Sequence, residues 1–540
     1  MEQKSAGRGF LILSIAGIAG KLLSAIYVPL LTAVLGDAGY GIYVAGYDIF
    51  VFLIAVTSLG AQPAVTKVVT ELRAMGNHKD ALRAMKLSIK YLAIISIAIA
   101  GIFMLLAFPI SKLIYREQSA WTFVFLGPAI IFAAILAAFR GYMQGVEEME
   151  SLAISQIIEQ LINVVLSLIF AALLISVTNK LEWGSAGGTV GTSLGAVVAI
   201  IYILYIYNKK NFKEEAELNH DPSRKRVSDK RIVKKLFMYA LPITLVAAVQ
   251  NFAGVIDSIT LARSLTSAGF DESKINSLTS VLSYYKTLIY VPLAIVTALG
   301  TSIFPKIIQA FVYKNKKELK QQTSYSFRMM YIIVIPATFG LAILSKEIYS
   351  FLFPSATATG YTLLMYGSTL LIFMSITTIQ NVILQGINKL YLIIVSASLG
   401  LLAKIIINIV LVSIPSVNIM GAVVGTFVSF IIPTIINHRK IKQFFKVNIP
   451  IVKQAIVPTI CSLLMSIGIL VAKFPIIKAS EALGGGRIIM AIVTLILIAV
   501  GGIIYLYTMI YFGGIRRKDL DLISPKLFKF LPRRLRKELI

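Results

Sequence analysis

Apolar residues in this chain come in long runs that are separated by short polar segments. Runs of about 20 residues cross a bilayer core of about 30 Å as α-helices. Helices satisfy their own backbone hydrogen bonds, which hydrocarbon cannot do. The pattern therefore predicts an all-α membrane protein with about fourteen transmembrane helices. We place these helices at residues 9–35, 41–66, 86–110, 120–144, 151–177, 186–207, 236–263, 278–305, 325–345, 360–386, 390–413, 418–437, 450–473 and 487–512.

Basic residues gather in alternate polar segments. The 540 residues include 52 Lys and Arg against 25 Asp and Glu, a net charge of +27. Alternation between the two sides of a membrane is the positive-inside pattern, and it predicts that both termini are cytoplasmic. It also argues against nucleic acid as the partner and favours anionic membrane lipids, which attract such clusters. The clusters run from Lys67 to Lys90, Lys209 to Lys235, Lys306 to Arg328, Arg439 to Lys453 and Arg516 to Lys537.

The two halves of the chain resemble each other. Gly187 to Thr192 and Gly421 to Thr426 open corresponding runs, and Gln144-Gly145 and Gln385-Gly386 close corresponding runs. Six helices per copy give both copies the same orientation, so we expect two parallel repeats. The predicted organisation is an N-lobe at 1–210 and a basic linker at 211–235, followed by a C-lobe at 236–445, two added helices at 446–513 and a basic tail at 514–540.

A duplicated helical bundle suggests a transporter that works by alternating access. Ionisable residues within its spans are functional candidates, because exposing them to lipid is costly. Lys21 and Lys286 lie in different halves, so we predict that they are cavity cations that bind a diphosphate. The structural alternative is that each lysine is paired with Asp48 or Asp257 and only holds helices together.

Other ionisable residues within or near the spans are further candidates for the site. Lys404 is a third predicted cavity cation. Glu159 joins Asp48 and Asp257 as an acid that could couple to an ion or pair with a base. Arg140 and Arg263 lie near span ends, where they could face the cavity or snorkel to the interface.

Motifs typical of enzymes are missing from the sequence. The three histidines lack metal-ligand spacing, and the single cysteine, Cys461, has no partner for a redox or zinc motif. We therefore expect no enzyme activity, no metal and no cofactor. Any driving force would come from an ion gradient, the membrane potential or the substrate gradient.

Several motifs together carry a resemblance to a known family. They are Leu35 to Tyr43, Leu59 to Lys67, Ala240 to Ile243, Ile256 to Ser258 and Ala298 to Pro305. With the expected spans, they resemble the polysaccharide-transporter branch of the MOP exporter superfamily. Within it, they are most similar to the stage V sporulation protein B and MurJ (YtgP)-like group, across the whole chain.

The resemblance implies a V-shaped fold and a role as a flippase. The substrate would be an undecaprenyl-diphosphate-linked oligosaccharide, with the peptidoglycan precursor lipid II first, flipped across the bacterial cell membrane. The two last helices would form a groove for the lipid tail, and the cell-wall synthesis machinery would be a partner. The resemblance leaves open a role in vegetative growth or in sporulation. Alternatives are another lipid-linked polysaccharide unit, a MATE-like cation or drug antiporter that depends on its acids, and a structural partner of cell-wall assembly.

Overall fold

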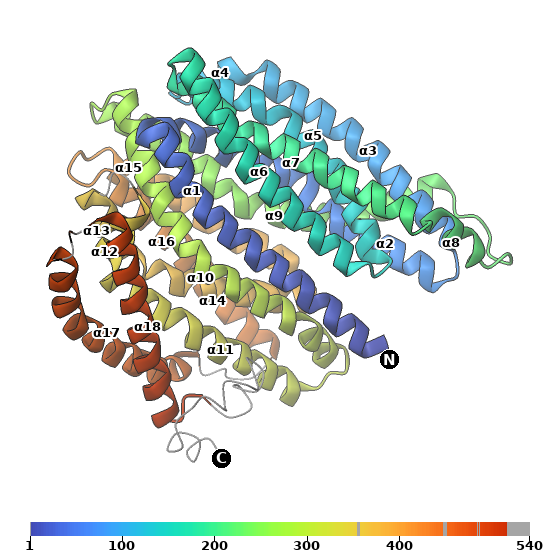
Figure 1. Cartoon of the computed structure of the whole chain (residues 1–540). Coiled ribbons are helices and arrows are strands. Elements are labelled where there is room, and N and C mark those ends of the chain that lie inside the picture. Colours follow the sequence, from blue (N-terminus) through green and yellow to red (C-terminus); the bar gives the residue numbers. More distant parts are fainter. Residues whose placement is uncertain (1, 354–356, 446–450, 483, 485, 516–540) are drawn as a thin grey trace. The chain divides into compact units, whose positions relative to one another are not determined.

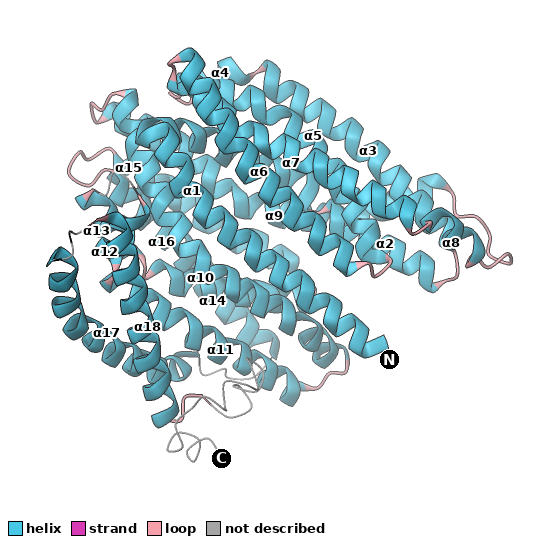
Figure 2. Ribbon diagram, viewed as in Figure 1, coloured by secondary structure: helices cyan, strands magenta, loops and turns pink. Residues whose placement is uncertain are grey.

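The structure is a computed structural model that describes residues 2–353, 357–445, 451–482, 484 and 486–515. Side chains are described for these residues except 2–15, 18, 21, 451 and 479–482. Within the described ranges all regular elements are helices, and strands are absent (Figure 2). The all-α prediction is confirmed.

The helices follow the predicted spans closely (Figure 1). Their bounds are α1 Glu2–Ile54, η1 Ala55–Leu59, α2 Ala61–Ala74, α3 His78–Leu105, α4 Ala107–Leu113, η2 Glu117–Ser119, α5 Ala120–Gly145, α6 Met149–Thr178, α7 Leu181–Lys209, α8 Phe212–Leu218, α9 Asp229–Ser267, α10 Glu272–Val312, α11 Lys316–Ile343, α12 Ser345–Leu352, α13 Ala358–Gly367, α14 Leu370–Gly386, α15 Leu390–Val412, α16 Ile419–Phe445, α17 Ile451–Ala482 and α18 Arg487–Tyr511.

The first two predicted spans join in one continuous run. Among the described residues, twelve helical segments are long and apolar enough to cross a membrane, or thirteen if α13 and α14, bent by 46°, count as one span. One of the twelve is the 53-residue stretch Leu22–Ala74, which is too long for one crossing of about 30 Å. Gly36 kinks α1 with φ 67°, a value that residues with a Cβ rarely adopt. A bend at Gly36 therefore replaces the loop expected between the first two spans.

The chain divides into two compact units. The first comprises Met1–Tyr284 and Leu390–Ser429, and the second comprises Tyr285–Lys389 and Phe430–Ile540. These bounds differ from the lobes expected at 1–210 and 236–445, because α9, the start of α10 and α15 pack in the first unit. The division into lobes stays a prediction.

Equivalent glycines make equivalent helix contacts in the two sequence repeats. A Cβ on Gly187 of α7 would lie 2.4 Å from the Phe170 carbonyl oxygen of α6, and one on Gly421 of α16 would lie 2.8 Å from the Leu411 carbonyl carbon of α15. Phe170 and Leu411 follow Gly145 and Gly386 at the same spacing. The repeated glycines therefore make the same kind of close helix contact in both copies.

A second glycine lies one turn further along α7 and along α16, and each also closely approaches the neighbouring helix. A Cβ on Gly191 would lie 2.3 Å from the Asn163 carbonyl oxygen, and one on Gly425 would lie 2.3 Å from Asn408 Oδ1. Real Cβ atoms do not approach so closely. A side chain at Gly191 would therefore push the two helices apart, whereas one at Gly425 would displace the Asn408 side chain.

We expect Gly191→Ala to lower the free energy of unfolding by about 1–3 kcal/mol, because the added methyl meets backbone rather than a flexible side chain. The measurement is thermal unfolding of the purified protein in detergent. Gly101→Ala is the matched control, because no atom lies within 4 Å of its Cβ position. Equal melting temperatures for the two variants would contradict the proposed tight contact.

Candidate functional site

Polar side chains of the first unit lie where α9 and the start of α10 contact the helices of the first sequence repeat. These contacts occur at two ends of the unit, which we name by their position. We call the end at which α2 ends and α3 and α9 begin the basic end, because it carries the clusters Lys67 to Lys90 and Lys209 to Lys235. We call the end with the Gly36 kink and the start of α10 the opposite end.

A fully buried polar cluster joins α9 to α15. Lys404 Nζ lies 2.8 Å from Asp257 Oδ2, and the two side chains are 1% and 2% exposed. Asn408 Nδ2 donates to Asp257 Oδ1 at 3.1 Å and to Thr260 Oγ1 at 2.9 Å. In a membrane interior an ammonium and a carboxylate are stable only when paired in this way, because neither can be hydrated there.

This pairing changes how Lys404 and Asp257 are interpreted. The sequence predicted Lys404 as a cavity cation and Asp257 as an acid for ion coupling or pairing. In the structure these two side chains form an ion pair with each other. The contact fixes the position of α15 on α9 within the first unit.

A second pair lies between α5 and α6. Arg140 Nη1 is 2.7 Å from Glu159 Oε2, and Arg140 Nε donates to Ser155 Oγ at 3.1 Å. Their side chains are 11% and 22% exposed, so the pair is largely shielded from the surroundings. The structure therefore joins one predicted cation and one predicted acid, both within the first repeat.

The remaining predicted residues are placed separately. Asp48 of α1 is half-buried, and a Cβ on Gly254 of α9 would lie 3.2 Å from its Cγ. Arg263 of α9 is exposed, and Lys286 of α10 is half-buried in the second unit. Lys21 belongs to α1, but its side chain lies outside the described residues. The assignment of Lys21 and Lys286 to a diphosphate stays a prediction.

Arg116 at the opposite end was not among the predicted residues. It follows α4, is fully buried, and donates through Nη1 to Asn276 Oδ1 and through Nη2 to Thr279 Oγ1, both at 2.6 Å. Burial lowers its pKa to about 10, which still leaves the guanidinium charged at neutral pH. A single arginine in a short polar connection looks like a hydrated loop charge, so the sequence pattern gave no signal of this contact.

Further hydrogen bonds close the same end. Tyr284 OH donates to Asp37 Oδ1 at 2.7 Å, and Ser280 Oγ donates to the Asp37 carbonyl oxygen at 2.5 Å. A Cβ on Gly41 would lie 1.9 Å from the Asn276 carbonyl oxygen, so α1 and α10 are in direct backbone contact there. The start of α10 is thereby held against α1 and the α4–η2 connection.

At the basic end the ion pairs made with α9 are more exposed. Glu71 of α2 accepts from Lys235 Nζ at 2.9 Å and from Tyr239 OH at 2.8 Å, and Lys67 Nζ lies 3.9 Å from the centre of the Tyr239 ring. The Glu71 and Lys235 side chains are 31% and 32% exposed. Arg83 also pairs with Asp229 at the start of α9.

The free energy needed to separate the helices therefore differs between the two ends. Partly exposed ion pairs such as Glu71–Lys235 contribute about 0–1 kcal/mol. Removing a partner from a fully buried charge such as Arg116 costs several times more. Parting α9 from α2 at the basic end is thus the cheaper of the two movements.

The described residues hold no group of three or more His, Cys, Asp or Glu side chains that could bind a metal ion. The polar contacts that the structure shows along α9 and α10 are charge pairs and hydrogen bonds.

Comparison with known proteins identifies the family. A family model described as "Polysaccharide biosynthesis protein" matches residues 6–311, more than half of the chain. The chain belongs to this family. The lipid II flippase MurJ of Bacillus subtilis (strain 168) is 25% identical over 538 residues, covering 97% of this chain and 98% of that protein. Stage V sporulation protein B of the same organism is 22% identical over 471 residues, covering 86% of this chain and 90% of its own length.

Solved structures agree on the fold. A structure described as "Lipid II flippase MurJ, inward closed conformation" aligns with a TM-score of 0.68 at 16% identity over 95% of this chain and all of that chain. An inward-facing MATE multidrug resistance transporter of the MOP superfamily aligns with a TM-score of 0.62 at 15% identity over 80% of this chain and 98% of that chain. This member of the polysaccharide biosynthesis protein family therefore has the MOP superfamily fold, as its sequence motifs predicted.

We expect Lys404→Met to destabilise this family member by about 3–5 kcal/mol, because it leaves the Asp257 carboxylate buried without its ammonium. The double variant Lys404→Met with Asp257→Leu should recover most of that loss, since it removes both charges together. Thermal unfolding in detergent measures both effects. A double variant less stable than Lys404→Met would show that the pair itself is not the source of the stability.

We expect Arg116→Gln to loosen the opposite end, because a neutral amide cannot replace two charge-assisted hydrogen bonds to α10. The measurement is maleimide labelling of Ser280→Cys, a fully buried position, in a Cys461→Ala background. Labelling should become roughly tenfold faster, which corresponds to about 1.4 kcal/mol of lost closure. Arg83→Gln at the basic end is the matched control, and equal labelling rates in both variants would rule out Arg116 as the closing residue.

Proposed function

We propose that this protein flips an undecaprenyl-diphosphate-linked oligosaccharide from the inner to the outer leaflet of a bacterial cytoplasmic membrane. The main support is the full-length likeness to the Bacillus subtilis lipid II flippase MurJ, which leaves neither chain with a large unmatched part. Lipid II, the peptidoglycan precursor, is accordingly our first substrate. The uneven distribution of basic residues supports an orientation with both termini and the basic end in the cytoplasm.

The contacts of α9 and α10 fit loading from the inner leaflet. The opposite end, which faces outward in this orientation, is closed by the buried Arg116, whereas the Glu71–Lys235 pair at the basic end is partly exposed. Opening inward is therefore the less costly movement from this conformation. A carrier that collects a precursor made in the cytoplasm needs this preference.

We further propose that the lysines predicted from the sequence bind the diphosphate, each contributing a mobile point charge. Lys21 belongs to α1 and Lys286 to α10, so the two lysines come from different halves of the chain. We propose that no cofactor is needed and that an ion gradient, the membrane potential or the substrate gradient drives the cycle.

A MATE-like cation or drug antiporter is the second candidate, supported by the shared fold. Such a protein would depend on free acids within its spans. Here Asp257 and Glu159 are paired with Lys404 and Arg140, so two of the three predicted acids are already neutralised. This pairing favours the flippase.

The test is a flipping assay in vesicles that contain the purified full-length protein and fluorescent lipid II, with other lipid-linked sugars as competitors. Transport of lipid II is expected, and movement of cationic drugs without any lipid-linked sugar would overturn the proposal. Adding ionophores to the same vesicles separates an ion gradient from membrane potential as the driving force.

Lys21→Ala and Lys286→Ala should each reduce the rate about tenfold or more, because a lost charge-assisted contact to phosphate is worth about 1.5–3 kcal/mol. Lys286→Arg should retain most activity, and Lys346→Ala, which removes an exposed lysine of α12, is the control. Undiminished flipping by both alanine variants would reject these two residues as the diphosphate ligands while leaving the substrate class intact.

A further inference from the structure

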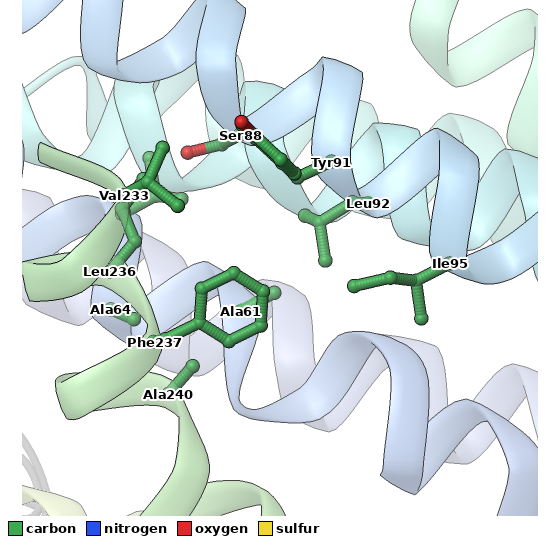
Figure 3. A pocket seen from close by; sticks show the side chains of 11 residues that line it. Ala61, Ala64, Ser88, Tyr91, Leu92, Ile95, Val233, Leu236, Phe237 and Ala240 are labelled. Atoms are coloured by element: carbon green, nitrogen blue, oxygen red, sulfur yellow. The ribbon is translucent and has the colours of Figure 1, made fainter. Parts of the chain in front are cut away.

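An apolar pocket lies between α2, α3 and α9 at the basic end. It measures about 380 Å³, including the part that is open to the surroundings. Figure 3 shows the α3 side chains, among them Leu92 and Ile95, on one side of the space and Phe237 of α9 on the other. Ala61 and Ala64 of α2 complete the lining. The pocket therefore contacts helices of both sequence repeats, within the first unit.

The pocket lining is almost entirely apolar. Ser88 is among the few polar lining residues, and its hydroxyl already donates to the Ala84 carbonyl oxygen of its own helix at 2.7 Å. Every other lining residue except Tyr91 has a purely apolar side chain. A peptide or a sugar would leave its own polar groups unpaired in such a space, whereas a hydrocarbon chain would not.

The position of the pocket fits the edge of a bilayer core. Its lining on α9 runs from Val233 to Ala240, roughly 6–16 Å along the helix from its start at Asp229. Phe237 and Tyr91 are 48% and 38% exposed, although both border the pocket. In a membrane these exposed rings face lipid, so an acyl chain can enter from the side.

Two unpaired lysines stand next to the pocket. Lys230 and Lys234 precede Val233 and Phe237 by three residues each, which places them on the same side of α9. Both are exposed, and neither forms an ion pair or hydrogen bond through its side chain with another described residue. Lys235, by contrast, points to Glu71 and is already neutralised.

We propose that this pocket binds one acyl chain of an anionic phospholipid, and that Lys230 and Lys234 hold its phosphate. The acyl chain supplies the hydrocarbon that fits the apolar lining, and the phosphate of the headgroup supplies an anionic partner for the two lysines. The bound lipid braces α9 against α2 and α3 beside the Glu71–Lys235 pair. The inference is independent of which lipid-linked sugar the protein transports.

The test is native mass spectrometry of the full-length protein, delipidated in detergent and titrated with phosphatidylglycerol or phosphatidylcholine of identical acyl chains. We expect phosphatidylglycerol to bind about tenfold more tightly or better, because each of the two lysines should raise the affinity for an anionic headgroup about fivefold. Lys230→Gln with Lys234→Gln should remove this preference. Lys316→Gln with Lys317→Gln, two exposed lysines at the start of α11, is the control with the same change of charge and should keep it.

A substitution that fills the pocket tests binding of the acyl chain separately from binding of the phosphate. Ala240→Phe should reduce binding of both phospholipids, with its melting temperature measured in parallel to exclude misfolding. If that variant does not fold, the lysine pair alone decides, because its changes lie on the exposed surface. An unchanged preference in the lysine variant, equal binding of phosphatidylcholine by the natural chain, or tighter binding of undecaprenyl phosphate than of phosphatidylglycerol would each overturn the proposal.

Discussion

Hydrocarbon offers no hydrogen bond and no hydration, and this constraint shapes every level of the structure. Backbone groups must be paired within each span, so the described chain is helical throughout its regular elements. Charged side chains within spans must also be paired, which is why Lys404 meets Asp257 and Arg140 meets Glu159. Charges that are free to be hydrated collect between the spans instead.

The same constraint explains how the helices pack. Association in lipid gains little from the hydrophobic effect, because the acyl chains are as apolar as the side chains. Close contact therefore depends on small residues, and Gly187 and Gly191 of α7 recur as Gly421 and Gly425 of α16. The repeated motif thus marks where two neighbouring helices approach closely, once in each copy.

Polar contacts at the two ends of the first unit differ in kind. Arg116 is fully buried and bonded to two side chains of α10, whereas Glu71 and Lys235 remain partly exposed. A difference of this kind gives a two-ended carrier a preferred side from which to open. The apolar pocket beside α9 adds a place where the membrane itself can act on that movement.

The sequence by itself determined the helical class, the approximate spans, the family and the duplicated glycines, because periodicity, hydropathy and local motifs are properties of neighbouring residues. It could not determine which ionisable groups pair. Lys404 and Asp257 lie 147 positions apart, and Arg116 and Asn276 lie 160 apart. Nothing in the local pattern distinguishes a buried arginine from a hydrated one, or a cavity lysine from one neutralised by a distant acid. Only the packing of α9, α10 and α15 decided these partners, because desolvation makes pairing obligatory while the tertiary structure selects the partner within reach.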